Sequence, residues 1–120
     1  MIEHIGFEVS DLEQTSRFYD AVFFALGARR LAENEHLVAY GINAPVFFFT
    51  QRGRPPAPGY GHLALQANGK AAVDAAHAAG LAGGGADDGA PGPRPQYGPR
   101  YYAGYLLDPD RLRVEVASRR

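Results

Sequence analysis

The chain has 120 residues, the length of one compact domain or of two small halves that share a core. Its net charge of −1 excludes bulk attraction to nucleic acid or anionic membranes, and its 46% of hydrophobic residues exclude a disordered chain. Cysteine is absent, which excludes disulfides, thiol catalysis and thiolate metal sites. Glycine and proline gather at 53–61 and 80–99, so we expect regular structure elsewhere.

A strand followed by a helix is predicted at the start of the chain. Apolar and polar residues alternate over 1–9, as in a strand with one buried face. Ser10 and Glu13 then form a capping box, which predicts that Ser10 is the N-cap of an amphipathic helix. Gly27 is expected to end this helix. Three strands are expected after it, near 29–32, near 37–40 and at 45–50.

The same order of elements returns in the second half. Alternation over 61–67 predicts a strand, and Asn68 is placed to cap a helix over 70–79 that Gly80 ends. A weak strand is expected near 81–88, with the rest of 80–99 as a loop that borders a binding cavity. Two further strands are expected at 101–107 and 112–117, joined by an Asp-Pro-Asp-Arg turn.

The spacing of matched residues indicates an internal repeat. His4 and His62 lie 58 positions apart, as do the two predicted caps. We therefore predict an α+β fold of two βαβββ modules, with module 1 at 1–52, a linker at 53–60 and module 2 at 61–120. Three prolines, Pro55, Pro56 and Pro58, are expected to stiffen the linker.

Three polar residues are predicted on the strand faces opposite the helices. They are His4, His62 and Glu115. If the two modules pack about a pseudo-two-fold axis, these side chains converge. Two imidazoles and one carboxylate would then form a metal site with open positions, which suits a divalent first-row ion that also binds substrate. The alternative is that each histidine is an ordinary hydrogen-bonded residue. His36 and His77 are expected at the surface.

Several segments carry a family resemblance. They are HIGFEVSDLE at 4–13, GHLAL at 61–65, DPD at 108–110 and VEV at 114–116. With them the chain resembles the vicinal oxygen chelate superfamily, which includes glyoxalase I, bleomycin-resistance proteins, fosfomycin-resistance thiol transferases and extradiol dioxygenases. The resemblance implies a curved eight-stranded mixed sheet around a cavity, in a homodimer. It also implies that His4, His62 and Glu115 hold one divalent ion, either Fe, Mn, Ni, Co or Zn.

The sequence departs from this family pattern at two places. Isomerases similar to glyoxalase I carry a fourth, carboxylate ligand within the segment that matches 46–49, where this chain has only Val and Phe. The resemblance therefore implies dioxygenase-like or transferase-like chemistry rather than isomerisation. Arg111 follows the Asp-Pro-Asp turn where relatives usually have Gly, so we expect a turn of a different type.

Aromatic and basic side chains supply further candidates. Tyr101, Tyr102 and Tyr105 lie on the strand next to Glu115, and of these Tyr102 and Tyr105 are predicted to donate a proton or hydrogen bond to substrate. Simple cross-strand packing is the alternative. The candidate substrate-binding residues are Phe47 and Phe49, which would line the cavity, and Arg94 and Arg100, which would clamp an anionic group.

The predicted function is a divalent-metal-dependent enzyme acting on a small oxygen-chelating substrate. The alternative is a metal-free small-molecule binding or drug-resistance protein, in which the histidines are ordinary cavity residues. A binder of cationic drugs is expected to have an acidic cavity, but only Glu8 and Glu115 are carboxylates on the relevant faces. A third alternative is a degenerate family member with an empty site. No nucleic-acid or membrane partner is expected, and a cytoplasmic location is expected by default.

Overall fold

The computed structural model describes residues 1–57, 59 and 61–120. Pro58 and Tyr60, within the predicted linker, lie outside the described residues. The first βαβββ series is β1 (Ile5–Glu8), α1 (Leu12–Ala25), β2 (Arg29–Glu33), β3 (Leu37–Gly41) and β4 (Pro45–Thr50). The second is β5 (His62–Gln66), α2 (Lys70–Ala82), β6 (Ala86–Pro93), β7 (Tyr102–Leu107) and β8 (Arg113–Ser118). None of the helices among the described residues combines the length and apolar composition of a membrane span.

The strands form two mixed sheets of the same topology. Their orders are β1-β4-β3-β2 and β5-β8-β7-β6, and in each sheet the first strand runs parallel to its neighbour. The predicted α+β fold of two βαβββ modules is thus confirmed. The single eight-stranded sheet is not formed, because β1 and β5 are edge strands that do not pair with each other. One chain therefore has two open sheets rather than one sheet curved around a cavity.

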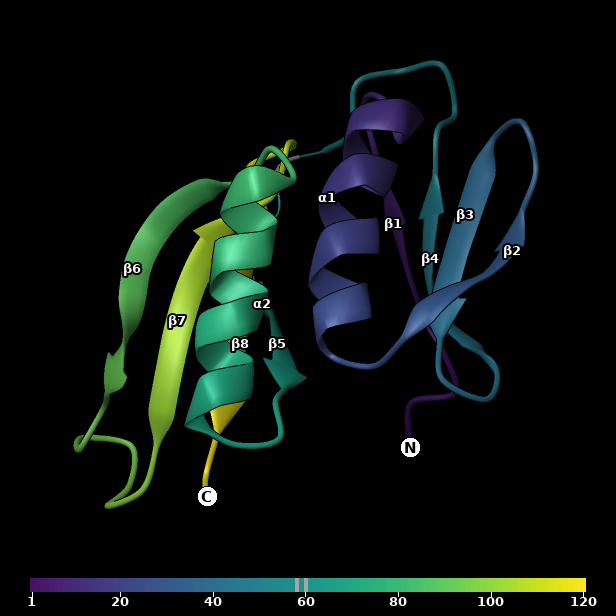
Figure 1. The fold of residues 1–120 in the computed structure, drawn as a ribbon. Helices are drawn as coiled ribbons and strands as arrows, with labels where there is room; N and C mark the ends of the chain where they lie inside the picture. The colour runs from purple at the N-terminus through teal and green to yellow at the C-terminus, as the bar shows by residue number, and fades with distance from the viewer. Residues whose placement is uncertain (58, 60) are drawn as a thin grey trace.

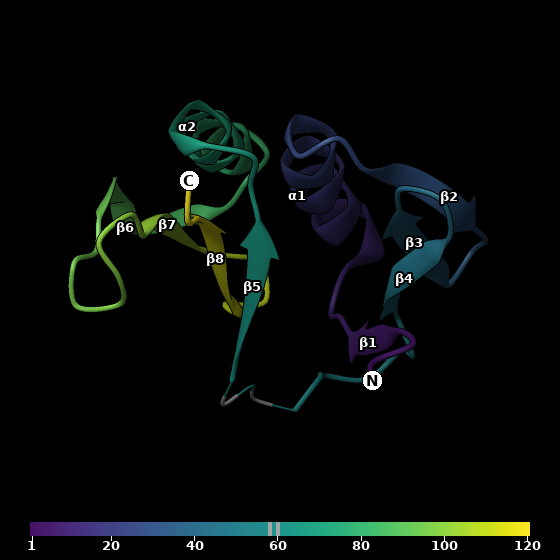
Figure 2. The ribbon, with the colours of Figure 1, turned by 90° about the horizontal axis from the view of Figure 1, so that it is seen from below.

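The helices lie side by side, with one sheet on either side of them (Figures 1 and 2). Helix α1 packs on the first sheet, and α2 packs on the second. Five residues on one stripe of α1 are buried: Thr15, Phe18, Tyr19, Val22 and Phe23. Tyr19 stacks on Phe49 of β4 with ring centroids 4.1 Å apart. Each sheet thus buries one face against its own helix and leaves the opposite face without a helix.

Helix α1 begins one residue later than predicted. Asp11 rather than Ser10 is the N-cap, and its carboxylate accepts hydrogen bonds from the backbone N–H groups of Glu13 and Gln14. The Ser10 N–H instead donates to the Asp110 carboxylate at 3.1 Å. The predicted cap at Ser10 is therefore wrong. Gly27 does follow the helix end, with a φ of +86° that favours glycine.

Helix α2 is capped and ended differently from the prediction. Its N-cap is Gly69, not Asn68, and it continues past Gly80 to Ala82. Gly80 is needed for close packing, because a Cβ atom there would lie 2.5 Å from Leu106 Cδ1 of β7. The glycine therefore marks a helix–sheet contact rather than a helix end.

The second Gly/Pro stretch contains β6, which overlaps the weak strand expected near 81–88 and extends to Pro93, where a loop is expected. β6 pairs with β7 in an irregular register and forms the sheet edge, where its prolines are tolerated. This edge is the one farthest from β5, which carries His62. Residues 86–93 therefore do not border His62, contrary to the prediction. Arg111 adopts a φ of +67°, in the left-handed region that favours glycine. The turn therefore has at Arg111 the backbone conformation that a glycine would adopt there.

Candidate functional site

The helix-free face of the second sheet carries the candidate site. Ala64 of β5, Glu115 of β8 and Tyr105 of β7 are Cα partners in adjacent strands, so their side chains project from the same face. The alternate residues of β8 are fully buried on the opposite face, Val114 in the core cluster that contains the α1 side chains and Val116 against α2. Strand alternation thus places Glu115 opposite the core, as the sequence predicts.

His62, Glu115 and Tyr101 form a connected polar group on this face. His62 Nε2 lies 3.2 Å from Glu115 Oε1, and the Tyr101 hydroxyl donates to Glu115 Oε2 at 2.5 Å. Glu115 is only 4% exposed, whereas the His62 side chain is 47% exposed. The bond to the Glu115 carboxylate, together with burial, raises the pKa of Tyr101 to about 12. Tyr101 is therefore a neutral donor near pH 7 that fixes one carboxylate oxygen.

The spacing of His62 and Glu115 fits two ligands of one metal ion. Nitrogen and oxygen ligands lie about 2.1 Å from a divalent first-row ion, so two ligands separated by an angle of about 100° are about 3.2 Å apart. The observed Nε2–Oε1 distance is 3.2 Å. An imidazole and a carboxylate are also ligand types that such ions accept. The exposed side of His62 leaves room for further ligands.

His4 does not join this pair within one chain. It lies just before β1, on the first sheet, and its exposed ring contacts the Glu3 carboxylate and the edge of Phe48. Among residues 1–57, 59 and 61–120, no group of three or more His, Asp or Glu side chains is placed to hold a metal ion. One chain thus brings together two of the three predicted ligands.

The tyrosines of β7 divide between its two faces. Tyr102 points toward α2, where its hydroxyl donates to Asp74 at 2.7 Å. Tyr105 lies on the face of Glu115, and burial together with the Glu115 charge raises its pKa. The sequence interpretation favoured Tyr102 over Tyr101. Strand alternation shows that Tyr102 and Tyr105, three positions apart, cannot share a face, and the register of β7 with β8 determines which of them lies beside Glu115.

The candidate substrate-binding aromatics lie on the core side of β4. Phe49 is fully buried against Tyr19, so a ligand cannot reach it. The prediction that Phe49 lines a substrate cavity is therefore not met within one chain. Phe47 packs against Phe23 and lines a pocket of about 480 Å³ between the modules. The β4 residue beside His4 on the helix-free face is Phe48.

The two candidate arginines occupy the end of the second module. Arg94 stacks over the Tyr105 ring, with its guanidinium carbon 5.2 Å from the ring centroid, and donates to the Ala90 and Ala103 carbonyls. Arg100 is exposed in the turn before β7. His36 is exposed, but His77 is buried and its Nε2 lies 3.0 Å from Asp87 Oδ1, contrary to the surface position expected.

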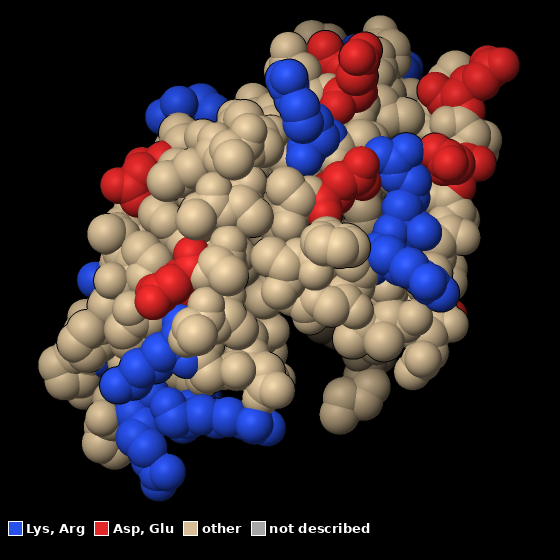
Figure 3. Space-filling view, viewed as in Figure 1, with Lys and Arg blue, Asp and Glu red and all other residues tan. Residues whose placement is uncertain are grey.

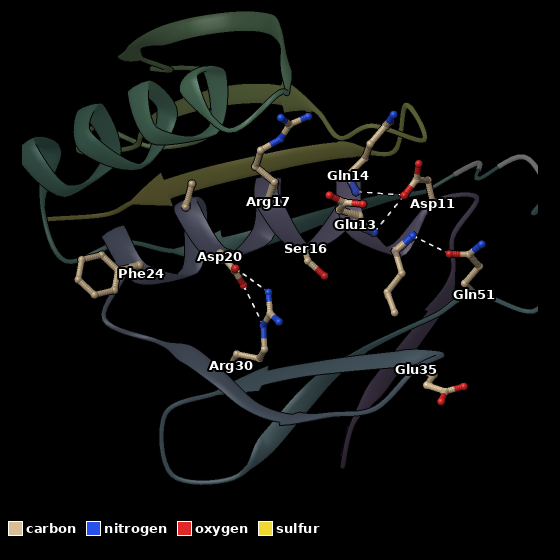
Figure 4. Close-up of a pocket in the computed structure, with 12 residues that line it drawn as sticks. Asp11, Glu13, Gln14, Ser16, Arg17, Asp20, Phe24, Arg30, Glu35 and Gln51 are labelled. Atoms are coloured by element: carbon tan, nitrogen blue, oxygen red, sulfur yellow. Dashed lines mark hydrogen bonds and ion pairs between the residues drawn. The ribbon is translucent and has the colours of Figure 1, made fainter.

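A larger hollow of about 1280 Å³ lies along α1, away from the His62–Glu115 pair (Figure 4). Several of its polar groups already form ion pairs or hydrogen bonds. Asp20 binds Arg30 at 2.6 Å, and the Gln51 side chain accepts the Leu12 N–H at 2.8 Å. These bonds stabilise α1 and its junction with the first sheet, so volume alone does not identify the candidate site.

Comparisons with known proteins agree on one family. The family model described as Glyoxalase/Bleomycin resistance protein/Dioxygenase superfamily matches residues 1–116. A glyoxalase/bleomycin resistance protein from Albidiferax ferrireducens T118 is 33% identical, with a TM-score of 0.85 and 96% of each chain covered. A glyoxalase-related enzyme from Fulvimarina pelagi is 24% identical, with a TM-score of 0.79 and coverage of 98% and 87%.

The fosfomycin resistance protein FosX from Mesorhizobium loti shares the fold. It is 24% identical, with a TM-score of 0.71 and coverage of 98% of this chain and 93% of that one. None of the curated proteins compared with the chain matches it.

Proposed function

Because the chain belongs to the glyoxalase/bleomycin resistance protein/dioxygenase superfamily, we propose that it is a divalent-metal-dependent enzyme. Its substrate is a small molecule that chelates the ion through adjacent oxygens. The observation that carries the proposal is the His62–Glu115 pair, whose 3.2 Å separation suits two ligands of one ion. The candidate ions are Fe, Mn, Ni, Co and Zn.

Each residue of the pair has a distinct role in this proposal. His62 supplies an exposed imidazole, and Glu115 supplies the carboxylate oxygen that Tyr101 leaves free. Tyr101 is a positioning residue, because its hydrogen bond orients the Glu115 carboxylate without contact to the ion. When bound, the ion supplies Lewis-acid stabilisation of negative charge on a substrate oxygen.

His4 completes the ligand set from a second copy of the chain. Within one chain His4 and His62 belong to separate sheets, which lie on either side of the packed helices (Figure 2). The helix-free faces of both sheets remain available for contact with another copy. In a two-fold dimer, the first sheet of one copy would face the second sheet of the other, and the symmetry would create two equal sites.

The residues beside His4 favour a three-ligand site. Gly6 and Phe48 are Cα partners in β1 and β4, and the Phe48 ring lies against His4. No carboxylate occurs in β4. A fourth carboxylate ligand that also moves a proton, as proposed for isomerases similar to glyoxalase I, is therefore missing from this position. Dioxygenase-like or transferase-like chemistry fits the proposal better than isomerisation.

Metal analysis tests the proposal. After incubation with each of the five candidate ions and removal of unbound ion, we expect about one ion per chain in the wild-type protein. His62→Ala and Glu115→Gln should each reduce this to less than about a tenth. His36→Ala is the matched control, because His36 is also exposed but lies on the other module. Retention of the ion by His62→Ala would contradict the proposal, and a wild-type protein that binds none of the ions would favour the metal-free binding protein.

A further inference from the structure

We propose that a small pocket beside the His62–Glu115 pair binds an anionic oxygen group of the substrate, with Arg119 as its principal cation. The anionic group is a carboxylate or a phosphate, because both present the oxygen geometry that a guanidinium recognises. This inference rests on the proposed function, since it assigns the charge class of the substrate that reaches the same site.

The pocket lies on the helix-free face of the second sheet and has a volume of about 310 Å³. It is lined by Ala64, Leu65, Gln66, Ala67, Tyr101, Ala117, Arg119 and Arg120. Small side chains create the space: Ala64 pairs with Glu115, and Ala117 pairs with Gln66 in the next strand. The volume suits one small organic molecule or one end of a larger one.

The position along β8 connects the pocket with the candidate metal ligands. Alternate residues of a strand share a face, so Glu115 and Ala117 lie on the same side of the sheet, about 7 Å apart along the strand. Arg119 follows directly after the end of β8 at Ser118. Its guanidinium lies over the ring of Tyr101, 4.8 Å from the ring centroid, and the Tyr101 hydroxyl binds Glu115. A substrate that contacts Ala117 can therefore reach both the candidate metal ligand Glu115 and the Arg119 guanidinium.

The charged side chains that line the pocket are those of Arg119 and Arg120. No Asp or Glu lines it, and within the described part of the chain neither Arg119 nor Arg120 forms an ion pair with a carboxylate. Basic side chains gather at the end of the second module near the C-terminus (Figure 3). A guanidinium stacked on an aromatic ring keeps its N–H edge for an anion. Arg119 is thus oriented by Tyr101 and has unused donors.

The test measures anion binding to the metal-free wild-type protein by NMR. Inorganic phosphate and acetate are titrated separately at low ionic strength, and the Arg119 Nε–Hε signal is followed. We expect saturable shifts with at least one of these anions, and the anion that binds more tightly identifies the group. Arg119→Gln and Ala117→Leu should each weaken this binding about tenfold or more, followed at the Gln66 amide, the first by removing charge and the second by filling the pocket.

Two controls make the outcome specific. Arg29→Gln removes the same charge from an exposed position on the first sheet and should leave the dissociation constant unchanged. His62→Ala should abolish metal binding but retain anion binding in metal-free protein. The two measurements therefore distinguish failure of the proposed metal site from failure of the proposed anion pocket. No saturable shift with either anion, or equal weakening by Arg29→Gln, would overturn the inference.

Discussion

Asp108 is a buried carboxylate through which the two modules contact each other. Its Oδ2 accepts a 2.7 Å hydrogen bond from the Tyr19 hydroxyl of α1. Its Oδ1 accepts the backbone N–H groups of Asp110 and Leu112, both at 2.9 Å. Burial is the largest influence on this group and raises the pKa of Asp108 above its ordinary value of 3.8, although these hydrogen bonds oppose the shift.

The raised pKa predicts a pH-dependent stability. Because the folded protein holds the Asp108 proton more tightly than the unfolded chain, this group stabilises the fold fully below pH about 3.8. That contribution is lost as the pH rises through the raised pKa. Asp108→Asn keeps an oxygen acceptor and does not titrate. The unfolding free energy of the wild type minus that of Asp108→Asn should therefore fall with rising pH in this window.

Urea unfolding at a series of pH values measures this difference. Asp108→Ala is a useful second variant, because it removes all three hydrogen bonds and should cost about 2–4 kcal/mol at neutral pH. A wild-type minus Asp108→Asn difference that does not change with pH would contradict the assigned pKa shift.

Some residues of the candidate site could be predicted from the sequence pattern, and others could not. Alternation along 112–117 is sufficient to place Glu115 opposite the core, and it does pair with His62. The same rule favours Tyr101 and excludes Tyr102 from this face, but only if the strand register is known. Arg119 resembles a solvated tail in sequence, because its stacking on Tyr101 depends on a neighbouring strand.

At the scale of elements, α2 packs closely against β7 and α1 through Gly80. A Cβ atom at this position would lie 2.5 Å from Leu106 Cδ1 and 3.1 Å from Val22 Cγ2. Helix propensity alone would make Gly80→Ala stabilising by about 1 kcal/mol. Overpacking costs about 1–3 kcal/mol, so we expect a net loss of up to about 2 kcal/mol.

Thermal and urea unfolding of Gly80→Ala measure this effect. Gly6→Ala is the control, because its added Cβ makes only ordinary contacts, at 3.8 Å or more, with Phe48. A Gly80→Ala protein that is more stable than the wild type would show that the helix can move away from β7 without cost.

The elements were predictable where local chemistry decides them. Hydrophobic periodicity identified both helices and the strands next to them, because burial of one face gives a regular pattern. The predicted caps at Ser10 and Asn68 are wrong, since the Asp11 carboxylate accepts the Glu13 and Gln14 N–H groups and Gly69 is the N-cap of α2. The full extent of β6 could not be predicted from the sequence, because its glycines and prolines are typical of a loop although an edge strand tolerates them.

For the whole molecule, the packing of α1 against α2 determines where the two helix-free faces lie. The sequence repeat places His4 and His62 at equivalent positions of two modules, but it does not specify whether those modules meet within one chain or between two. In the structure the edge strands β1 and β5 remain unpaired, and the helices make the contact between modules. The central proposal is therefore a metal site shared by two copies.

Complementation between two inactive variants tests this proposal most directly. His4→Ala and His62→Ala chains are unfolded together in equal amounts, refolded, and analysed for bound metal. Each variant alone should bind almost none. In the mixture half of the dimers would be mixed, and each mixed dimer would have one intact site of two, giving about 0.25 ion per chain. A mixture that binds no more metal than the separate variants would contradict a site built from His4 of one copy and His62 with Glu115 of the other.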